Sequence, residues 1–391
     1  MVPRPPEGAY YNRLKIPPPA RHRPDLSPRV NSAENELDFP WTSAPAPGDV
    51  AAVRPGVYWL RMPLPFALNH INLWLLEDEI DGQRGWTAID CGIADEPTRR
   101  LWETLFDRRF GGRPLLRVIA THFHPDHLGL ADWLSRGGDR ARWSAPVWMT
   151  AAEYLVGRFL ATAGATTLRL DSEPHRRFYE AHGVGSEEAT RRAQSRGERR
   201  YAYLVPAVPP SYRRIHDNES IRIGTAGAQR EFRVITGFGH APEHASLMCF
   251  EDGILISGDM VLPSISTNVS VYDVEPEANP LSRYLESIDR LASLPADTLV
   301  LPSHGLPFFG LRARVEQLHA HHRMRLDEAL QACHVPRTAE ELLPVLFRRP
   351  LDQHQVTFAF GEGLAHLHHL WYGGMLKRDR GADGIYRFSR V

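Results

Sequence analysis

A run of six residues, His122-Phe123-His124-Pro125-Asp126-His127, constrains the fold of this chain more than any other feature. It directly follows the apolar run 115–120, which predicts a buried β-strand. In the turn after a strand, side chains spaced by two residues can converge on one cation while their neighbours point to another. Borderline cations such as Zn²⁺ bind imidazole nitrogen and carboxylate oxygen. The run therefore predicts a metal site at the carboxyl end of a strand, with surface histidines of a loop as the alternative.

Three later motifs extend this pattern. Gly239-His240, Gly258-Asp259 and Ser303-His304 each lie beside an apolar run that predicts a strand, at 232–235, 254–257 and 298–301. With these motifs the sequence resembles the metallo-β-lactamase fold superfamily, whose signature is a His-x-His-x-Asp-His loop followed by a separated His, Asp and His. The resemblance covers roughly residues 50–310.

The resemblance implies a centre with two metals. The residues that match the family's ligands are His122, His124 and His240 for the first metal, Asp126, His127 and His304 for the second, and Asp259 as the bridge between them. Asp90 matches the first family motif, in which a carboxylate supports the ligand loop without touching a metal. His244 is expected beside the ligands, as a supporting histidine or one that touches substrate. Cys91 is not expected to bind metal.

The resemblance also implies an α/β fold, a four-layer αββα sandwich. We expect this sandwich over residues 49–310, with a helical insertion at about 151–218. Residues 1–48 form a proline-rich arm, because 11 of the 32 prolines lie in the first 50 residues and proline disfavours long helices and central strands. Residues 311–391 predict helices at 312–332, 338–347 and 361–376 and a strand at 384–388, which indicates a small helical winged-helix-like domain.

The overall charge excludes one class of partner. Forty-six basic and 47 acidic residues leave a net charge of −1, so no bulk positive field attracts nucleic acid or an anionic membrane. No stretch approaches about 18 consecutive apolar residues, and the first 20 residues lack the apolar segment of a signal peptide. We therefore expect a cytoplasmic protein that binds neither nucleic acid nor membrane. The proline-rich arm also allows a homodimer.

Two further groups of residues have alternative interpretations. Ten arginines lie between positions 169 and 214, among them Arg176, Arg177 and those of the segment 191–200. They can bind a carboxylate or the phosphates of a CoA group. The favoured alternative is that they pair with glutamates of the same helices. The histidines of 319–322 and 366–369 lie on predicted helices without carboxylate or cysteine partners, so we expect solvated or interhelical histidines.

The predicted metal centre indicates a hydrolase. Two dications held close together lower the pKa of a bridging water and supply hydroxide at neutral pH, with Asp126 and Asp259 as the expected catalytic carboxylates. We expect two Zn²⁺ per chain, with Fe or Mn as alternatives.

The arrangement of core, insertion and appended helices resembles hydrolases related to glyoxalase II and the lactamase-β-like 2 group. This resemblance implies a small activated acyl substrate: a thioester, ester or lactone, CoA-linked compounds included. The alternative is a metal-dependent nuclease (phosphodiesterase). Less favoured are a β-lactamase and a mono-iron persulfide dioxygenase.

Overall fold

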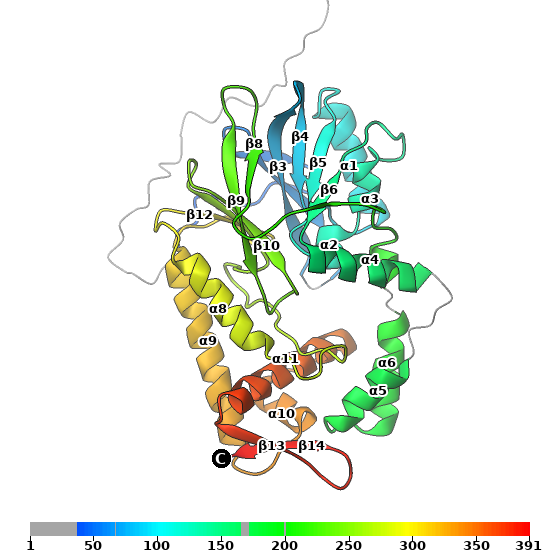
Figure 1. Cartoon of the computed structure of the whole chain (residues 1–391), viewed down its shortest axis with the longest axis vertical. Coiled ribbons are helices and arrows are strands. Elements are labelled where there is room, and N and C mark those ends of the chain that lie inside the picture. The colour runs from blue at the N-terminus through cyan, green and yellow to red at the C-terminus, as the bar shows by residue number, and fades with distance from the viewer. Residues whose placement is uncertain (1–36, 67, 166–171, 199–200) are drawn as a thin grey trace, which may run out of the picture.

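Two β-sheets form the centre of the computed structural model, which describes residues 37–66, 68–165, 172–198 and 201–391 (Figure 1). The first sheet has seven strands, in the order β1 (Val50–Arg54), β2 (Val57–Pro63), β3 (His70–Ile80), β4 (Gln83–Ile89), β5 (Leu115–Ile119), β6 (Val147–Met149) and β7 (Arg213–Arg214). Strands β1 to β4 pair antiparallel, and β4 to β7 pair parallel. A turn at Asp81-Gly82 joins β3 to β4, with φ of 51° and 77° at its two residues.

The second sheet has five strands, in the order β12 (Leu299–Pro302), β11 (Ile254–Gly258), β10 (His244–Cys249), β9 (Arg230–Gly237) and β8 (Ser220–Ile223). β11 and β12 are parallel, and the other neighbours are antiparallel. Successive side chains along a β-strand point to opposite faces of the sheet. In β11, Ile254 and Ile256 face the first sheet, and Leu255 faces the helices on the other side.

Helices cover the outer face of each sheet. The first sheet packs against α1 (Glu96–Arg108) and α3 (Ala131–Ser135), through side chains that include Trp102 and Leu134. The second packs against α8 (Pro280–Ala292) and α9 (Leu311–Ala332), through Tyr284 and Leu318 among others. Asp95 begins α1 by accepting a hydrogen bond from the Thr98 amide. The layers are helix, sheet, sheet, helix, so the predicted αββα sandwich is confirmed.

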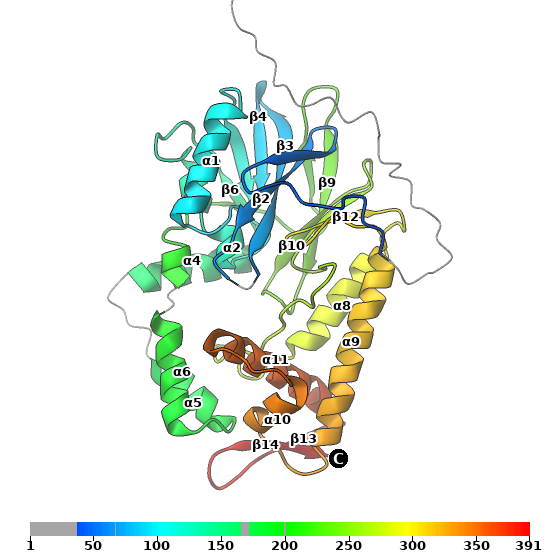
Figure 2. The ribbon, with the colours of Figure 1, turned by 180° about the vertical axis from the view of Figure 1, so that it is seen from behind.

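Four helices lie between β6 and β7, in the region of the predicted insertion: α4 (Ala151–Ala165), α5 (Ser172–Ala181), α6 (Ser186–Glu198) and α7 (Tyr201–Leu204). α4 packs against α7, and α7 against α2 (Pro125–Leu128), at the end of the first sheet where α2 lies, whereas α5 and α6 lie beside the C-terminal helices (Figure 2). Tyr179 and Val184 belong to the same apolar core as Leu342 and Phe360 of those helices. The insertion therefore connects the sandwich to the C-terminal part of the chain.

The C-terminal part contains α9, α10 (Ala339–Leu346) and α11 (Gln353–Tyr372), followed by the antiparallel pair β13 (Leu376–Arg380) and β14 (Tyr386–Arg390). Thr338 and Glu341 form a capping box at the start of α10. The predicted helix 361–376 is wrong at both ends. It begins at Gln353 and ends before Gly374, whose φ of 71° favours glycine and ends a helix. Strand β13 was not predicted, and the winged-helix comparison stays a prediction.

Part of the proline-rich arm lies within the described residues. Positions 1–36 lie outside them. Asp38 forms a β-bridge with Phe309, and the ring of Trp41 packs edge-on against Trp59 of β2. No helix in the described ranges has the length and apolar character needed to cross a membrane.

Candidate metal centre

The predicted ligands meet where several strands end. His122 lies three residues after β5, and α2 (Pro125–Leu128) then carries Asp126 and His127. His240 follows β9, Asp259 follows β11 and His304 follows β12. The backbone amide of Ala245 in β10 donates to the carbonyl of Thr121, 2.8 Å away, which joins the two sheets next to the cluster. The strand ends of both sheets thus position all the predicted ligands in one place.

Seven residues form three overlapping groups in which the possible ligand atoms lie within 4.8 Å of one another: His122, His124 and His240; His122, His127 and Asp259; and Asp126, His127 and His304. In the first group, His122 Nε2 is 2.8 Å from His124 Nδ1 and 3.2 Å from His240 Nε2. The structure thus brings together every residue predicted as a ligand. Such a set of imidazoles and carboxylates matches the preference of Zn²⁺ and similar cations.

Asp259 lies between the histidines of the first group and those of the third group. Its Oδ2 is 3.5 Å from His240 Nε2. Its Oδ1 is 3.5 Å from Nε2 of both His127 and His304. The Nε2 atom of His304 is also 3.4 Å from Asp126 Oδ2. One oxygen of Asp259 therefore faces each side of the cluster, so this carboxylate could contact a cation on either side.

Asp90 holds the ligand loop from the side opposite the cluster. Its Oδ1 accepts from the Thr121 amide at 2.7 Å, and its Oδ2 lies 2.8 Å from His127 Nδ1. Asp90 has a φ of 63°, which is uncommon for a residue other than glycine and turns the chain sharply after β4. The contact fixes the ring of His127 so that Nε2 points into the cluster. The role predicted for Asp90 agrees with this geometry.

Two other ligand rings are held through main-chain carbonyls. His240 Nδ1 lies 2.8 Å from the carbonyl oxygen of Asn268, and His304 Nδ1 lies 2.8 Å from that of His70. In both rings this leaves Nε2 for a metal. Sequence reasoning missed these supports, because every residue type carries a carbonyl and the contact leaves no pattern in the sequence.

His244 contacts the backbone of Asp259. It is fully buried, and its Nε2 accepts from the Asp259 amide at 3.1 Å. A Cβ on Gly258 would lie 2.2 Å from that same nitrogen, and Gly258 has a φ of 54°. Glycine is therefore required there so that His244 can approach the backbone. His244 is placed as a supporting histidine.

Burial lowers the pKa of three of the imidazoles. In His122 and His124 burial acts together with neighbouring imidazoles, and the pKa of His124 falls to about 3. Burial also lowers the pKa of His240, with the Asp259 carboxylate opposing it. These rings are therefore neutral at pH 7 and ready to accept a cation.

The other two imidazoles behave in the opposite way. Burial disfavours the charge on His127 and His304, but neighbouring carboxylates outweigh it and raise the pKa of both rings. These are Asp126, Asp90 and Asp259 for His127, and Asp259 and Asp126 for His304, whose pKa rises to about 10. The carboxylates thus favour positive charge near His127 and His304, carried either by protons on the two rings or by a bound cation.

Two buried atoms test whether a metal fits the cluster. His127 Nε2 and Asp259 Oδ1 have no hydrogen-bond partner among the described residues, although both are inaccessible to solvent. A buried polar atom without a partner is costly, and a cation between these two atoms would remove that cost. The donor set and these two atoms fit a metal.

Glu153 is a buried carboxylate that sequence reasoning missed. It lies in the first turn of α4, and its two oxygens accept from the Phe123 amide at 2.9 Å and the Glu243 amide at 2.6 Å. Phe123 lies between two ligands, and Glu243 lies three residues after His240. Glu153 thus joins the two loops that carry five of the seven cluster residues. Burial raises its pKa to about 7, although the two amides oppose this.

The cysteine nearest the cluster has no free thiolate. Cys91 is fully buried, and burial, with Asp90 beside it, raises the pKa of its thiol. A neutral buried thiol is a poor nucleophile and a poor ligand. Cys91 is absent from the three groups that can hold a metal in the described part of the chain.

Most arginines of α5 and α6 form ion pairs. Arg176 pairs with Glu173 and Glu180, Arg177 with Glu173, Arg191 with Glu188, and Arg192 with both Glu188 and Glu340. The expected pairing with glutamates of the same helices is found for all four, but Arg192 is buried and also pairs with a glutamate of α10, which was not expected. Arg169, Arg199 and Arg200 lie outside the described residues.

The C-terminal histidines include an interhelical pair. His322 Nδ1 of α9 lies 3.2 Å from His366 Nε2 of α11, and both rings are buried. His319 pairs with Asp289 of α8 at 2.7 Å. His322 and His366 form the expected interhelical contact, whereas His319 has a carboxylate partner, which the sequence analysis did not expect.

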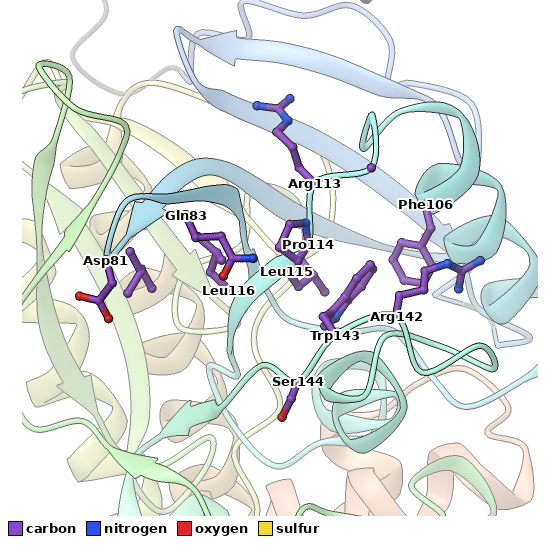
Figure 3. A pocket seen from close by; sticks show the side chains of 12 residues that line it. Asp81, Gln83, Phe106, Arg113, Pro114, Leu115, Leu116, Arg142, Trp143 and Ser144 are labelled. Carbon is purple, nitrogen blue, oxygen red and sulfur yellow. The ribbon is translucent and has the colours of Figure 1, made fainter. Parts of the chain in front are cut away.

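A pocket of about 640 Å³ lies far from the cluster (Figure 3). Its lining includes Asp81 and Gln83 at the β3–β4 turn and Pro114 before β5, so it lies at the opposite end of these strands from the ligand loop. Its two guanidinium groups are engaged, Arg142 by Glu103 and Asp107, and Arg113 by Glu77 at 3.7 Å. We assign it no part in the chemistry.

Comparisons with known proteins agree with this geometry. The family model described as the metallo-beta-lactamase superfamily matches residues 68–304, and the model described as a metallo-beta-lactamase-like C-terminal domain matches 326–391. The chain is 24% identical to the "probable metallo-hydrolase YqjP" of Bacillus subtilis over 304 residues, which span 75% of this chain and 86% of that protein.

Two solved structures are also similar. A beta-lactamase domain protein from Burkholderia ambifaria is 52% identical, with a TM-score of 0.83 over 92% of this chain and 100% of the other. A metallo-beta-lactamase family protein from Thermus thermophilus is 30% identical, with a TM-score of 0.67 over 87% of this chain and 100% of the other. With a superfamily model that matches more than half of its residues, the chain belongs to the metallo-beta-lactamase superfamily.

Proposed function

We propose that the protein is a metal-dependent hydrolase with two metals, most simply two Zn²⁺, that cleaves an activated acyl substrate such as a thioester, ester or lactone. The observation that carries the proposal is Asp259, whose two oxygens face opposite sides of a cluster of five imidazoles and a second carboxylate. His122, His124 and His240 would hold one metal, and Asp126, His127 and His304 the other. Bound there, two divalent cations supply a water of lowered pKa and polarise the substrate carbonyl.

The protein's own residues orient the site and move protons. Asp90 and the carbonyls of Asn268 and His70 fix three ligand rings. Asp126 is the more exposed of the two carboxylates, with 18% of its side chain accessible against 11% for Asp259. Asp126 is therefore better placed to pass a proton to a leaving group.

The surroundings favour an acyl substrate over a phosphodiester. The ion-paired arginines of α5 and α6 are not a free cationic surface, and the net charge is −1. A nucleic acid needs such a surface, because phosphate contacts supply most of its affinity. Because these arginines are already paired, we do not assign them to the phosphates of a CoA group. We propose that the protein recognises the acyl part of its substrate.

Turnover on a panel of substrates tests the proposal. The panel contains an acyl-CoA, a glutathione thioester, a lactone and bis-p-nitrophenyl phosphate, with Asp126→Asn as the matched variant. We expect turnover of at least one acyl substrate and its loss in the variant. Turnover of the phosphodiester alone would contradict the proposal and identify a nuclease.

A further inference from the structure

A buried segment, residues 267–273, runs beside the metal cluster and continues to the C-terminal helices. It follows β11 and precedes α8, and it has no regular secondary structure. Thr267, Val269, Ser270 and Val271 are each at most 6% exposed. Val269 and Val271 belong to the apolar core shared by α8, α9, α10 and α11. A loop buried to this extent is unusual, because its backbone groups need partners inside the protein.

One end of the 267–273 segment contacts two predicted metal ligands. The hydroxyl of Thr267 donates to the backbone carbonyl of Asp259. The carbonyl of Asn268 lies 2.8 Å from Nδ1 of His240. These contacts orient one ligand of the first metal and the carboxylate that faces both metals.

The other end contacts elements outside the sandwich. The Val271 amide donates to the Gly361 carbonyl of α11 at 3.1 Å, and Asp273 forms an ion pair with His175 of α5. A Cβ on Gly361 would lie 2.7 Å from both Cβ and Oγ of Ser270, so α11 and the segment are in direct contact there. Side-chain movement alone cannot relieve such a clash when the atoms belong to a short, buried serine.

We propose that the 267–273 segment is a positioning element through which α11 sets the orientation of His240 and Asp259. A displacement of the segment at Ser270 moves the Asn268 carbonyl and the Thr267 hydroxyl, and so reorients both ligands. The C-terminal helices thereby act on the metal centre without contributing a ligand to it. This inference rests on the metal-binding part of the proposed function and is independent of the substrate.

Two helical glycines of α11 provide a matched test. Gly361→Ala places a methyl group against Ser270, whereas the same methyl on Gly363 lies 3.5 Å from Leu343 Cδ2, an ordinary contact. Both variants gain the same helix propensity. The measurements are the apparent Kd for Zn²⁺ against a competing chelator, the visible spectrum of the Co²⁺-loaded protein, and the melting temperature of the metal-free protein.

We expect Gly361→Ala to weaken metal affinity by about 10-fold, the scale of lost support behind a ligand, and to shift the Co²⁺ spectrum. Gly363→Ala should match the wild type in metal affinity and in the Co²⁺ spectrum.

A second pair of variants replaces the first if Gly361→Ala does not fold. Thr267→Val removes the hydroxyl at Asp259, and Thr298→Val removes a buried hydroxyl that has no hydrogen-bond partner among the described residues. Only Thr267→Val should weaken metal binding.

Equal affinities and equal spectra within both pairs would overturn the inference. The comparison uses no substrate, so it is separate from the test of the proposed function. A wild-type protein that binds metal but hydrolyses no acyl compound would contradict the proposed function and leave the comparison valid.

Discussion

Asp259 is the residue on which both halves of the metal centre depend. Its Oδ1 faces His127 and His304, and its Oδ2 faces His240. No other carboxylate in the three described groups is within reach of both sides, because Asp126 groups only with His127 and His304. Removing this side chain leaves two sets of imidazoles that no longer share a ligand.

Asp259→Ala should therefore abolish hydrolysis and reduce metal content, by about one metal per chain if only the more weakly held ion is lost. The fold should persist, since Asp259 lies outside the helices and strands, directly after β11. Turnover, elemental analysis and far-UV circular dichroism measure the three effects. Wild-type turnover in the purified variant would contradict the account.

Metal uptake should release protons at neutral pH. The pKa values of His127 and His304 are raised, to about 10 for His304, so both rings are protonated at pH 7 in the metal-free protein. A metal binds the neutral ring, so uptake releases about two protons per chain and affinity rises with pH up to about 10. In the metal-free protein, the stability from these protonated rings is fully present below about pH 6.5 and is lost as pH rises through the raised pKa.

Titration calorimetry in buffers of different ionisation enthalpy counts these protons. Zinc affinity that does not change between pH 6 and pH 9 would contradict the assignment of these two histidines as ligands.

Glu153→Gln tests the buried carboxylate between the ligand loops. Glutamine has nearly the same volume as glutamate, but its side-chain NH₂ group would face one of the two backbone N–H groups that donate to Glu153. We expect zinc affinity to fall by about 10-fold. Asp78→Asn is the control, since Asp78 is an equally buried carboxylate that pairs with Arg117 away from the cluster. A similar loss of zinc affinity in both variants would show that Glu153 acts only through general stability.

The predicted ligands act through their side chains, whereas two of the supports that the sequence did not reveal act through their main chain. Each predicted ligand is an ionisable side chain next to an apolar run, and the end of a strand fixes its position. Asn268 and His70 act through main-chain carbonyls, which every residue has. Glu153 reads as the ordinary acidic residue of a helix's first turn. Contacts of that kind become visible only in three dimensions.

At the scale of elements, the insertion is held to the C-terminal part by a buried arginine. Arg192 of α6 is 5% exposed, and its two terminal nitrogens lie 2.8 and 2.7 Å from the carboxylate oxygens of Glu340 in α10. Its guanidinium also reaches Glu188 on its own helix. Such a bidentate pair fixes the angle between the two helices. The sequence predicts that the arginine is paired, but not that one partner lies 148 residues away.

Arg192→Met should lower the free energy of unfolding by about 1–2 kcal/mol, since Glu188 and Glu340 are partly exposed and recover water. Urea denaturation measures the effect. Arg191→Met is the control, because Arg191 is exposed and, among the described residues, pairs with Glu188 of its own helix alone. Equal stabilities of the two variants would show that the contact between α6 and α10 contributes nothing measurable.

At the scale of the whole molecule, one apolar core joins the sandwich to the C-terminal helices. It contains Leu255 and Val300 of the second sheet, Ile288 of α8, and Leu318 and Phe360 of α9 and α11. Periodicity in the sequence predicts most of the strands and helices that build this core. It does not predict that α5 and α11 pack together, because that contact is between elements far apart in the chain. Cytoplasmic location and a homodimer stay predictions.

Deleting residues 311–391 should therefore destabilise the sandwich itself. The deletion uncovers the apolar faces of α8 and of the insertion, and we expect the melting temperature to fall by more than about 10 °C. Differential scanning calorimetry on the truncated and full chains makes the comparison. An unchanged melting temperature would mean that the C-terminal part is an independent unit.

Metal content, measured on protein purified without added metal, tests the central claim most directly. The account predicts about two zinc, iron or manganese ions per chain by elemental analysis, together with hydrolysis of an acyl substrate that a chelator abolishes and added metal restores. Hydrolysis that persists in metal-free protein would contradict it. One iron per chain with oxygen consumption on a persulfide would leave the fold correct and the proposed reaction wrong.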